Sequence, residues 1–196
     1  MQACPPKLTR LCKGLLFSAV ALVGACDRGV ASEHAARARP VVAGPSPADQ
    51  AAADFVAGAM GDDLFEARAA QIAAARAQAP AVKALAAASL HNSADSTQAL
   101  NRSIAESGRK LPAPPGLSDH LQSMLNQLSR GTAKDFDKTY IEQQVEANQD
   151  ALNRLSAYAG NGAIPALKAA AGAMAPVREA QLDQARSIQD ELNKTP

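Results

Sequence analysis

The chain has 196 residues, 20% of them charged, and a formal net charge of +1, so it lacks the basic surplus expected of a nucleic-acid-binding protein. Aromatic residues make up 3% of the chain, tryptophan is absent, and alanine is the most frequent residue. Because alanine is the strongest helix former and β-branched residues are sparse, the composition favours an all-α protein.

Residues 1–25 have the pattern of a secretion signal. Basic but no acidic residues precede Asp27, an apolar run begins at Gly14, and small residues stand just before Cys26. The apolar run is shorter than the roughly 20 residues that a membrane-spanning helix needs. The box Leu22–Cys26 resembles that of bacterial lipoprotein signals, so we expect cleavage before Cys26 and lipidation of its sulfur. Acyl chains, each contributing about 0.8 kcal/mol per buried methylene, would anchor the mature chain to a membrane.

Residues 26–48 are expected to form a flexible tether, because glycine and proline interrupt any helical periodicity there. Cys4 and Cys12 would leave with the signal, and Cys26 would carry lipid. No pair then remains for a disulfide. The bundle domain, residues 49–196, must therefore be stabilised by packing alone.

The bundle domain begins with two predicted helices, over about residues 48–78 and 81–107. Pro80 stands where the second begins, a position that tolerates proline, and Gly108 ends it. The proline-rich segment 110–116 is too interrupted for a helix. We expect it to cross from the first helix pair to the second.

A short helix is predicted after the crossover and ends at Gly131; its apolar stripe consists of Leu117, Leu121, Leu125 and Leu128. The clearest amphipathic segment, about residues 140–158, follows it. It should close at Gly160–Gly162, residues that accept left-handed backbone. The last helix, about residues 164–193, contains Pro176 and should kink there. Four long helices with short turns and one crossover predict a four-helix bundle with a short extra helix in the crossover.

Helical spacing places polar side chains on inward faces of the long helices. Asn148 shares its face with Ile141, Val145, Leu152 and Leu155. Ser93 shares its face with Ala86, Leu90, Thr97 and Leu100, and Gln181 with Val177, Ala185, Ile188 and Leu192. We hypothesise that Glu66, Ser93, Asn148 and Gln181 form a hydrogen-bonded cluster between helices, because an unpaired buried polar group costs about 1–3 kcal/mol. The alternative is that some of them rotate to the bundle edge and meet water.

The histidines predict no metal site. A di-iron bundle needs Glu-x-x-His motifs on two helices, and the sequence has none. His91 lies on a different helical face from the predicted cluster, and His34 and His120 are expected in solvent. Asp62 and Asp63 are interpreted as carboxylates near a helix start that complement the helix dipole, rather than as cation ligands.

Motifs typical of enzymes were not found either. The chain has no phosphate-binding glycine loop, no G-x-S-x-G and no H-E-x-x-H. After processing, no free thiol would remain as a nucleophile. We therefore expect neither catalysis nor a cofactor.

Five stretches together resemble the bacterial envelope family known as domain of unknown function 4142, from about residue 55 to 192. They are Glu66 with Pro80–Lys83; Leu100 with Gly108 and Leu111-Pro112; Gly131; Phe136–Tyr140; and Pro176. The resemblance implies a ferritin-like four-helix bundle with an inward glutamate, an aspartate-histidine pair and two further histidines. The corresponding positions here hold Glu66, Asn92-Ser93, Asn148 and Gln181, so one possible ligand remains.

The sequence thus predicts a non-catalytic lipoprotein of the bacterial cell envelope, lipid-anchored and facing the periplasm. Its bundle would act as an interaction or structural module, with an envelope protein or the cell wall as partner and no nucleic acid. The alternative is a ferritin-like metal-binding or redox protein that uses Glu66 with unrecognised ligands.

Overall fold

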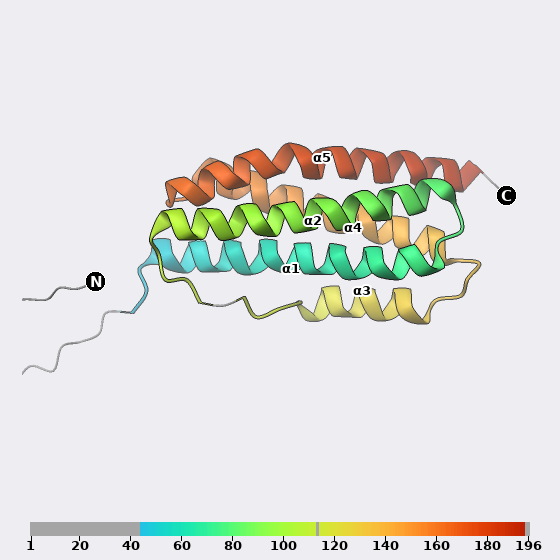
Figure 1. Ribbon diagram of the computed structural model, residues 1–196, viewed down its shortest axis with the longest axis horizontal. Coiled ribbons are helices and arrows are strands. Elements are labelled where there is room, and N and C mark those ends of the chain that lie inside the picture. The colour runs from blue at the N-terminus through green and yellow to red at the C-terminus, as the bar shows by residue number, and fades with distance from the viewer. Residues whose placement is uncertain (1–43, 113, 195–196) are drawn as a thin grey trace, which may run out of the picture. The chain divides into compact units, whose positions relative to one another are not determined.

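The computed structural model describes residues 44–112 and 114–194, and this part contains five α-helices and no strand. The helices are α1 (Pro47–Arg76), α2 (Pro80–Ser107), α3 (Asp119–Arg130), α4 (Phe136–Asn161) and α5 (Pro165–Lys194) (Figure 1). The predicted all-α class is confirmed. The predicted signal, Cys26 and most of the tether lie outside the described residues. No helix of the described part combines the length and the apolar character needed to cross a membrane.

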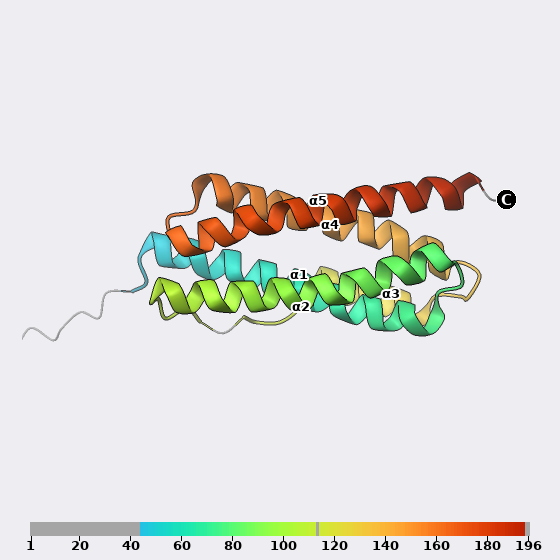
Figure 2. The ribbon, with the colours of Figure 1, turned by 45° about the horizontal axis from the view of Figure 1, so that its top comes forward.

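The four long helices form two antiparallel hairpins, α1 with α2 and α4 with α5 (Figure 2). The hairpins pack together through contacts of α2 with α5 and of α1 with α4, while α3 lies outside against α1 and α4. The segment after α2 runs back along the bundle before α3 begins, as expected of a crossover (Figure 1). The result is an all-helical bundle in which every long helix contacts two others.

Local chemistry explains where the helices begin and end. The Ser46 hydroxyl accepts a hydrogen bond from the backbone N–H of Asp49 at 3.1 Å and so caps α1. Ser118 caps α3 in the same way, through the N–H of Leu121 at 3.3 Å. α2 ends at Gly108, whose φ of 64° is the left-handed conformation that favours glycine. This end matches the sequence prediction.

The end of α4 differs from the prediction. Gly160–Gly162 were expected to close the helix with left-handed backbone, yet Gly162 has φ −61° and ψ 135°. Among the described glycines, positive φ is found at Gly108 and Gly116. A Cβ atom at Gly162 would lie 2.5 Å from the Tyr158 ring. Close packing, not backbone handedness, is therefore what requires a glycine here.

Proline marks helix starts in this bundle. Pro47, Pro80 and Pro165 each occupy the first position of a long helix, where the missing N–H breaks no hydrogen bond. Pro176 is different, because it lies inside α5, which runs unbroken to Lys194. The fixed φ of proline is compatible with a helix, but the ring removes one backbone hydrogen bond at this point.

The core consists of two apolar clusters along the bundle. One contains Phe65, Phe136 and Tyr140 and lies where α3 packs. The other contains Phe55 and Tyr158, whose rings stack at 4.0 Å between centroids. Most of the buried polar residues come from the stretches of the long helices between these clusters: Asp62, Asp63, Ser89, Ser93, Asn148, Arg178 and Gln181.

Side chains from other helices cap the start of α2 and the end of α3. The residue before α2 is Ala79, which has no capping side chain. The Asp137 carboxylate of α4 accepts instead from the backbone N–H groups of Gln78 at 3.0 Å and Ala79 at 2.7 Å. At the end of α3, Arg76 donates to the backbone carbonyls of Leu128, Ser129 and Gly131. These contacts join the α1–α2 connection to the α3–α4 connection at one end of the bundle.

Candidate functional site

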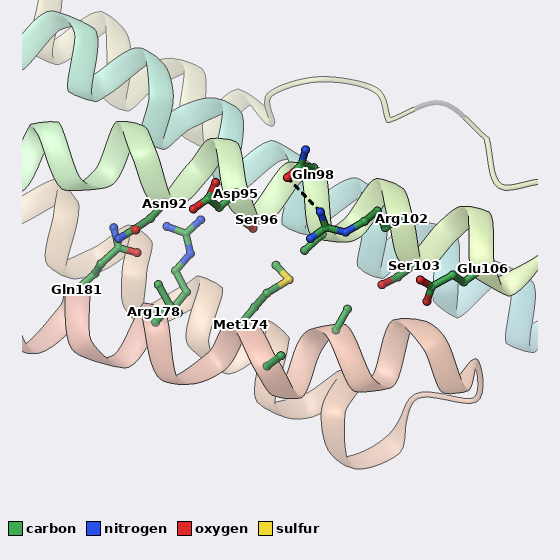
Figure 3. A pocket seen from close by; sticks show the side chains of 14 residues that line it. Asn92, Asp95, Ser96, Gln98, Arg102, Ser103, Glu106, Met174, Arg178 and Gln181 are labelled. Atoms are coloured by element: carbon green, nitrogen blue, oxygen red, sulfur yellow. Dashed lines mark hydrogen bonds between the residues drawn. The ribbon is translucent and has the colours of Figure 1, made fainter.

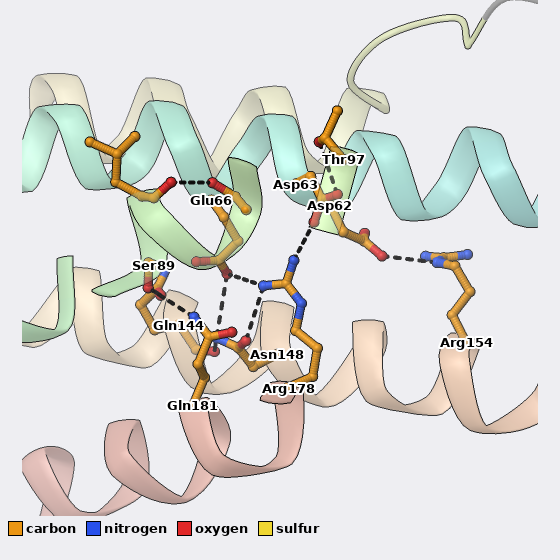
Figure 4. Close-up of polar contacts among 12 residues, drawn as sticks. Asp62, Asp63, Glu66, Ser89, Thr97, Gln144, Asn148, Arg154, Arg178 and Gln181 are labelled. Atoms are coloured by element: carbon orange, nitrogen blue, oxygen red, sulfur yellow. Dashed lines mark hydrogen bonds and ion pairs between the residues drawn. The ribbon is translucent and has the colours of Figure 1, made fainter. Parts of the chain in front are cut away.

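The centre of the bundle holds a buried arginine, Arg178 of α5 (Figure 4). Its side chain is only 4% exposed. The guanidinium donates to Asp63 Oδ1 at 2.5 Å and to Asn148 Oδ1 at 3.4 Å, and it lies 3.9 Å from Glu66 Oε1. Asp63 and Glu66 belong to α1 and Asn148 to α4. One side chain of α5 therefore ties three helices together.

Amides and a hydroxyl extend these contacts to α2. Asn148 Nδ2 donates to Glu66 Oε1 at 3.3 Å and to the backbone carbonyl of Gln144 at 2.9 Å. Ser89 of α2 donates to Gln144 Oε1 at 3.2 Å and accepts from Gln181 Nε2 at 3.3 Å. We call the whole set the interior network; it comprises Asp63, Glu66, Ser89, Gln144, Asn148, Arg178 and Gln181.

The structure brings two of the four predicted cluster residues into direct contact. Glu66 and Asn148 are hydrogen-bonded to each other, whereas Gln181 reaches Ser89 instead. Ser93 donates to the backbone carbonyl of Leu90 on its own helix and contacts none of the other three by hydrogen bonds. All four predicted side chains are buried, so none of them meets water at the bundle edge.

The inward face of α2 is shifted from the predicted one. Leu90 was placed on this face, but it is 41% exposed, and its neighbour Ser89 is fully buried. Alanines surround this part of α2, so the spacing from Ala86 to Leu90 fits a helical stripe as well as the spacing from Leu85 to Ser89. The two possible inward faces of α2 therefore do not differ enough in hydrophobicity for the sequence to indicate that Ser89 is buried.

The helix-dipole interpretation of Asp62 and Asp63 is wrong. α1 begins at Pro47, so both carboxylates lie well beyond its first turn, and each has an arginine partner. Arg154 of α4 donates to Asp62 Oδ2 at 3.0 Å, while Asp63 is paired with Arg178. Asp63 also accepts from Thr97 of α2 at 3.1 Å, so both carboxylates link helices.

A glycine makes room for the second of these arginines. A Cβ atom at Gly58 would lie 2.6 Å from the Arg154 guanidinium. Any larger side chain would push this group away from Asp62. Gly58 thus lets a side chain of α4 reach a carboxylate of α1.

Burial raises the pKa of the Asp62, Asp63 and Glu66 carboxyls, because their charged forms lose hydration. Arg154 opposes this rise at Asp62, and Arg178 opposes it at the other two. A single guanidinium thus faces two buried carboxyls and lies nearer to Asp63 than to Glu66. Of these two carboxyls, Glu66 therefore has the weaker contact with the guanidinium.

The interior residues do not fit the metal centre that the family resemblance implies. Two of the expected ligand positions hold the amides Asn148 and Gln181, and a permanently charged guanidinium lies against the remaining carboxylate. His91 and His120 are exposed and pair with acidic residues on the surface. Within the described residues, no group of three or more His, Cys, Asp or Glu side chains could hold a metal ion.

Comparison with known proteins identifies the family. A family model described as Domain of unknown function (DUF4142) matches residues 37–188. The chain belongs to this family. No curated protein and no solved structure matches it. The resemblance found in the sequence is confirmed, and since the DUF4142 description names no activity, membership alone fixes no function.

Four members of the interior network were not predicted from the sequence: Asp63, Ser89, Gln144 and Arg178. Arg178 is the most consequential, because it supplies the charge that neutralises the carboxylates. One signal was available, since Arg178 stands three residues before Gln181 and therefore shares its helical face. Arginine is almost never fully buried unless it is paired, so helical spacing alone did not select it.

Proposed function

We propose that this DUF4142 protein is a lipoprotein of the cell envelope, anchored through Cys26, whose folded part is a ferritin-like four-helix bundle without catalytic activity. The bundle acts as an interaction or structural module that faces the periplasm. The observation that carries this proposal is the position of Arg178, which neutralises Asp63 and contacts Glu66 in the bundle centre.

A metal-binding bundle places carboxylates and histidines around a central cation. Here the central cation is a side chain of the protein itself, and it cannot be deprotonated. The carboxylates of α1 are used to hold α5, and the amides of α4 and α5 complete the hydrogen bonds. Such a network fixes how the helices are aligned but leaves no ligand set for redox chemistry.

The test of the non-metal proposal is elemental analysis of the purified full chain, after exposure to iron, manganese and zinc and then dialysis. We expect substoichiometric metal in the wild type and in Glu66→Ala alike. Stoichiometric metal that is lost in Glu66→Ala, but kept in the exposed-site control Glu142→Ala, would overturn the proposal in favour of a ferritin-like metal protein.

Anchoring is tested separately, by fractionation of cells that produce the full chain. We expect the wild type in the membrane fraction, to be released only by detergent, and Cys26→Ser to lose this attachment. Cys12→Ser is the matched control, because Cys12 would leave with the signal. Wild-type protein in the cytosol, or membrane attachment of Cys26→Ser, contradicts the lipoprotein assignment.

The interaction role is tested by cross-linking in intact cells, followed by identification of the captured material. We expect an envelope protein or a cell-wall fragment with the wild type and its loss with Cys26→Ser, because the bundle would no longer be held at the membrane. Capture that is the same with and without the anchor contradicts an interaction that depends on the membrane.

A further inference from the structure

A groove of about 430 Å³ lies between α2 and α5, on the side of the interior network (Figure 3). Its volume is within the range of roughly 300–1,000 Å³ that small-molecule sites occupy, and seams between helices are common places for them. Arg178 and Gln181 line the groove from α5. Both belong to the interior network, so the wall of the groove is held in place by fixed contacts.

Two residues that line the groove have a buried polar atom without a hydrogen-bond partner, Ser96 Oγ on α2 and Gln181 Oε1 on α5. Gln181 is 3% exposed, and its amide nitrogen is used by Ser89. Its Oε1 atom is buried and accepts no hydrogen bond. Because an unsatisfied buried acceptor has lost its hydration without gaining a hydrogen bond, a ligand that supplies an N–H or O–H donor at this point is stabilised there.

The charges along the groove favour a cation. Asp95 and Glu106 of α2 contribute two carboxylates to its lining. Arg102 lies between them in the sequence and donates to Gln98, and Arg178 is neutralised by its own buried partner. Asp95 also lies 3.3 Å from His91, and Arg102 offsets one of the two carboxylates, so the lining carries at most one negative charge in excess.

The α5 side of the groove is apolar between its polar ends, whereas Gln98, Arg102 and Ser103 line the α2 side of the same stretch (Figure 3). Ala99 of α2 and Ala173 and Met174 of α5 line this part. In Figure 3 the Met174 side chain stands between the end with Asn92 and Asp95 and the end with Glu106. A ligand with a charged head and a short hydrocarbon body matches this order of polar and apolar lining.

We propose that this groove binds a small organic cation, a primary ammonium with an apolar body. The ammonium donates to Gln181 Oε1 near Asp95, and the hydrocarbon lies on Ala173 and Met174. The site requires neither the membrane anchor nor a protein partner, so it stands or falls independently of the proposed envelope function.

The experiment is a titration of the purified full chain, labelled with ¹³C in its methionine methyl groups, with n-butylammonium chloride, n-butanol or sodium butyrate at constant ionic strength. Met174 reports on the groove, while Met124, a buried residue of α3, is an internal control. We expect a saturable shift of the Met174 signal with n-butylammonium, at least about tenfold tighter than with butyrate, which corresponds to about 1.4 kcal/mol. The Met124 signal should not move.

Two variants locate the site. Ala173→Phe fills the groove from an exposed position of α5 and should abolish the shift, whereas Ala169→Phe, exposed on α5 outside the groove lining, should not. Gln181→Met removes the unpartnered acceptor and should remove the preference for n-butylammonium over n-butanol. Three results would overturn the proposal: butyrate binding as tightly as n-butylammonium, a Met174 shift that survives in Ala173→Phe, or no saturable shift up to about 50 mM ligand.

Discussion

Arg178 is the side chain on which the interior network depends, because it contacts residues of α1 and α4 at once. Removing one partner of a buried ion pair leaves an uncompensated charge and costs about 3–5 kcal/mol. We therefore expect Arg178→Met to lower the free energy of unfolding by this amount at neutral pH, measured by urea denaturation. Arg186→Met, at a half-exposed position of α5, is the control and should change it by less than about 0.5 kcal/mol. If Arg178→Met were as stable as the wild type, the ion pair between Arg178 and Asp63 would contribute nothing to the free energy of unfolding.

Glu66 gives the protein a pH-dependent stability whose sign follows from its surroundings. Burial raises its pKa in the folded state, so the folded chain binds a proton more tightly than the unfolded chain. The stabilisation is complete below the unfolded pKa of about 4.3 and is lost as the pH rises through the folded value. Asp62 and Asp63 act in the same direction.

The neutral variant Glu66→Gln should therefore be less sensitive to pH. We expect its free energy of unfolding to fall less steeply than that of the wild type between pH 5 and pH 8, and to exceed the wild-type value at the upper end. Urea denaturation at several pH values measures this, with the exposed Glu142→Gln as control. Identical slopes for Glu66→Gln and the wild type would place the titrating group elsewhere.

The chemistry of a polar residue determined whether its burial could be predicted from the sequence. Ser93, Asn148 and Gln181 were correctly expected inside, because each shares a helical face with apolar residues, whereas the inward position of Glu66 was implied by the family resemblance. The burial of Arg178 was not predicted, because charged residues are normally solvated and an arginine in a helical sequence is therefore expected on the surface. Its partner Asp63 is thirty-four residues before Thr97 and more than a hundred before Arg178, and no local pattern connects positions so far apart.

At the scale of helices, Asp137 stabilises an element to which it does not belong. Its carboxylate caps α2 from the first turn of α4. Loss of a cap costs about 0.5–2 kcal/mol, so Asp137→Ala should lower the free energy of unfolding by about 1 kcal/mol. Hydrogen exchange of the Ala79 amide should become faster in this variant, which distinguishes the loss of the α2 cap from an effect on α4 alone. An unchanged Ala79 exchange rate contradicts capping across helices; Glu142→Ala is the control.

Two glycines near the end of α4 should respond oppositely to alanine. Gly160 lies in the helix with nothing within 4 Å of an added Cβ, so Gly160→Ala should stabilise the protein by about 0.5–1 kcal/mol. Gly162→Ala would bring a Cβ within 2.5 Å of Tyr158, whose ring is held by stacking on Phe55. We expect this overpacking to cost about 1–3 kcal/mol, measured by thermal unfolding. The added Cβ would also lie 2.5 Å from the backbone carbonyl oxygen of Tyr158, so a stabilising Gly162→Ala would mean that the end of α4 shifts to relieve both contacts.

Helix boundaries were the most predictable part of the fold. Proline at the start and glycine at the end mark α2 in the sequence, and both markers act through local backbone geometry. Gly162 was misinterpreted because its role depends on Tyr158, a packing contact, rather than on its own φ. The contact of Asp137 with the start of α2 could not be predicted from the sequence either, because it depends on α4 lying beside the start of α2.

At the scale of the whole molecule, the polar contacts join one hairpin to the other. Arg178 links α5 to α1, Arg154 links α4 to α1, and Ser89 links α2 to both α4 and α5. Much of the remaining interior is alanine. Its small side chains let helices pack closely, but they interdigitate little and so do not fix the position of one helix along another. We infer that apolar packing supplies most of the stability, whereas the interior network selects one alignment of the hairpins.

This division of roles predicts the behaviour of a variant in which the central ion pairs become apolar, Asp63→Leu combined with Glu66→Met and Arg178→Met. Well-packed apolar residues often replace a buried ion pair with no loss, or with a gain of about 1–4 kcal/mol, so urea denaturation should show a stability at least equal to that of the wild type. Without the network, several hairpin alignments become similar in free energy, and the amide NMR spectrum should contain more than one signal for residues of α1 and α5. A single sharp set of signals would mean that alanine packing alone specifies the alignment. A large loss of stability would mean that the ion pairs themselves hold the bundle together.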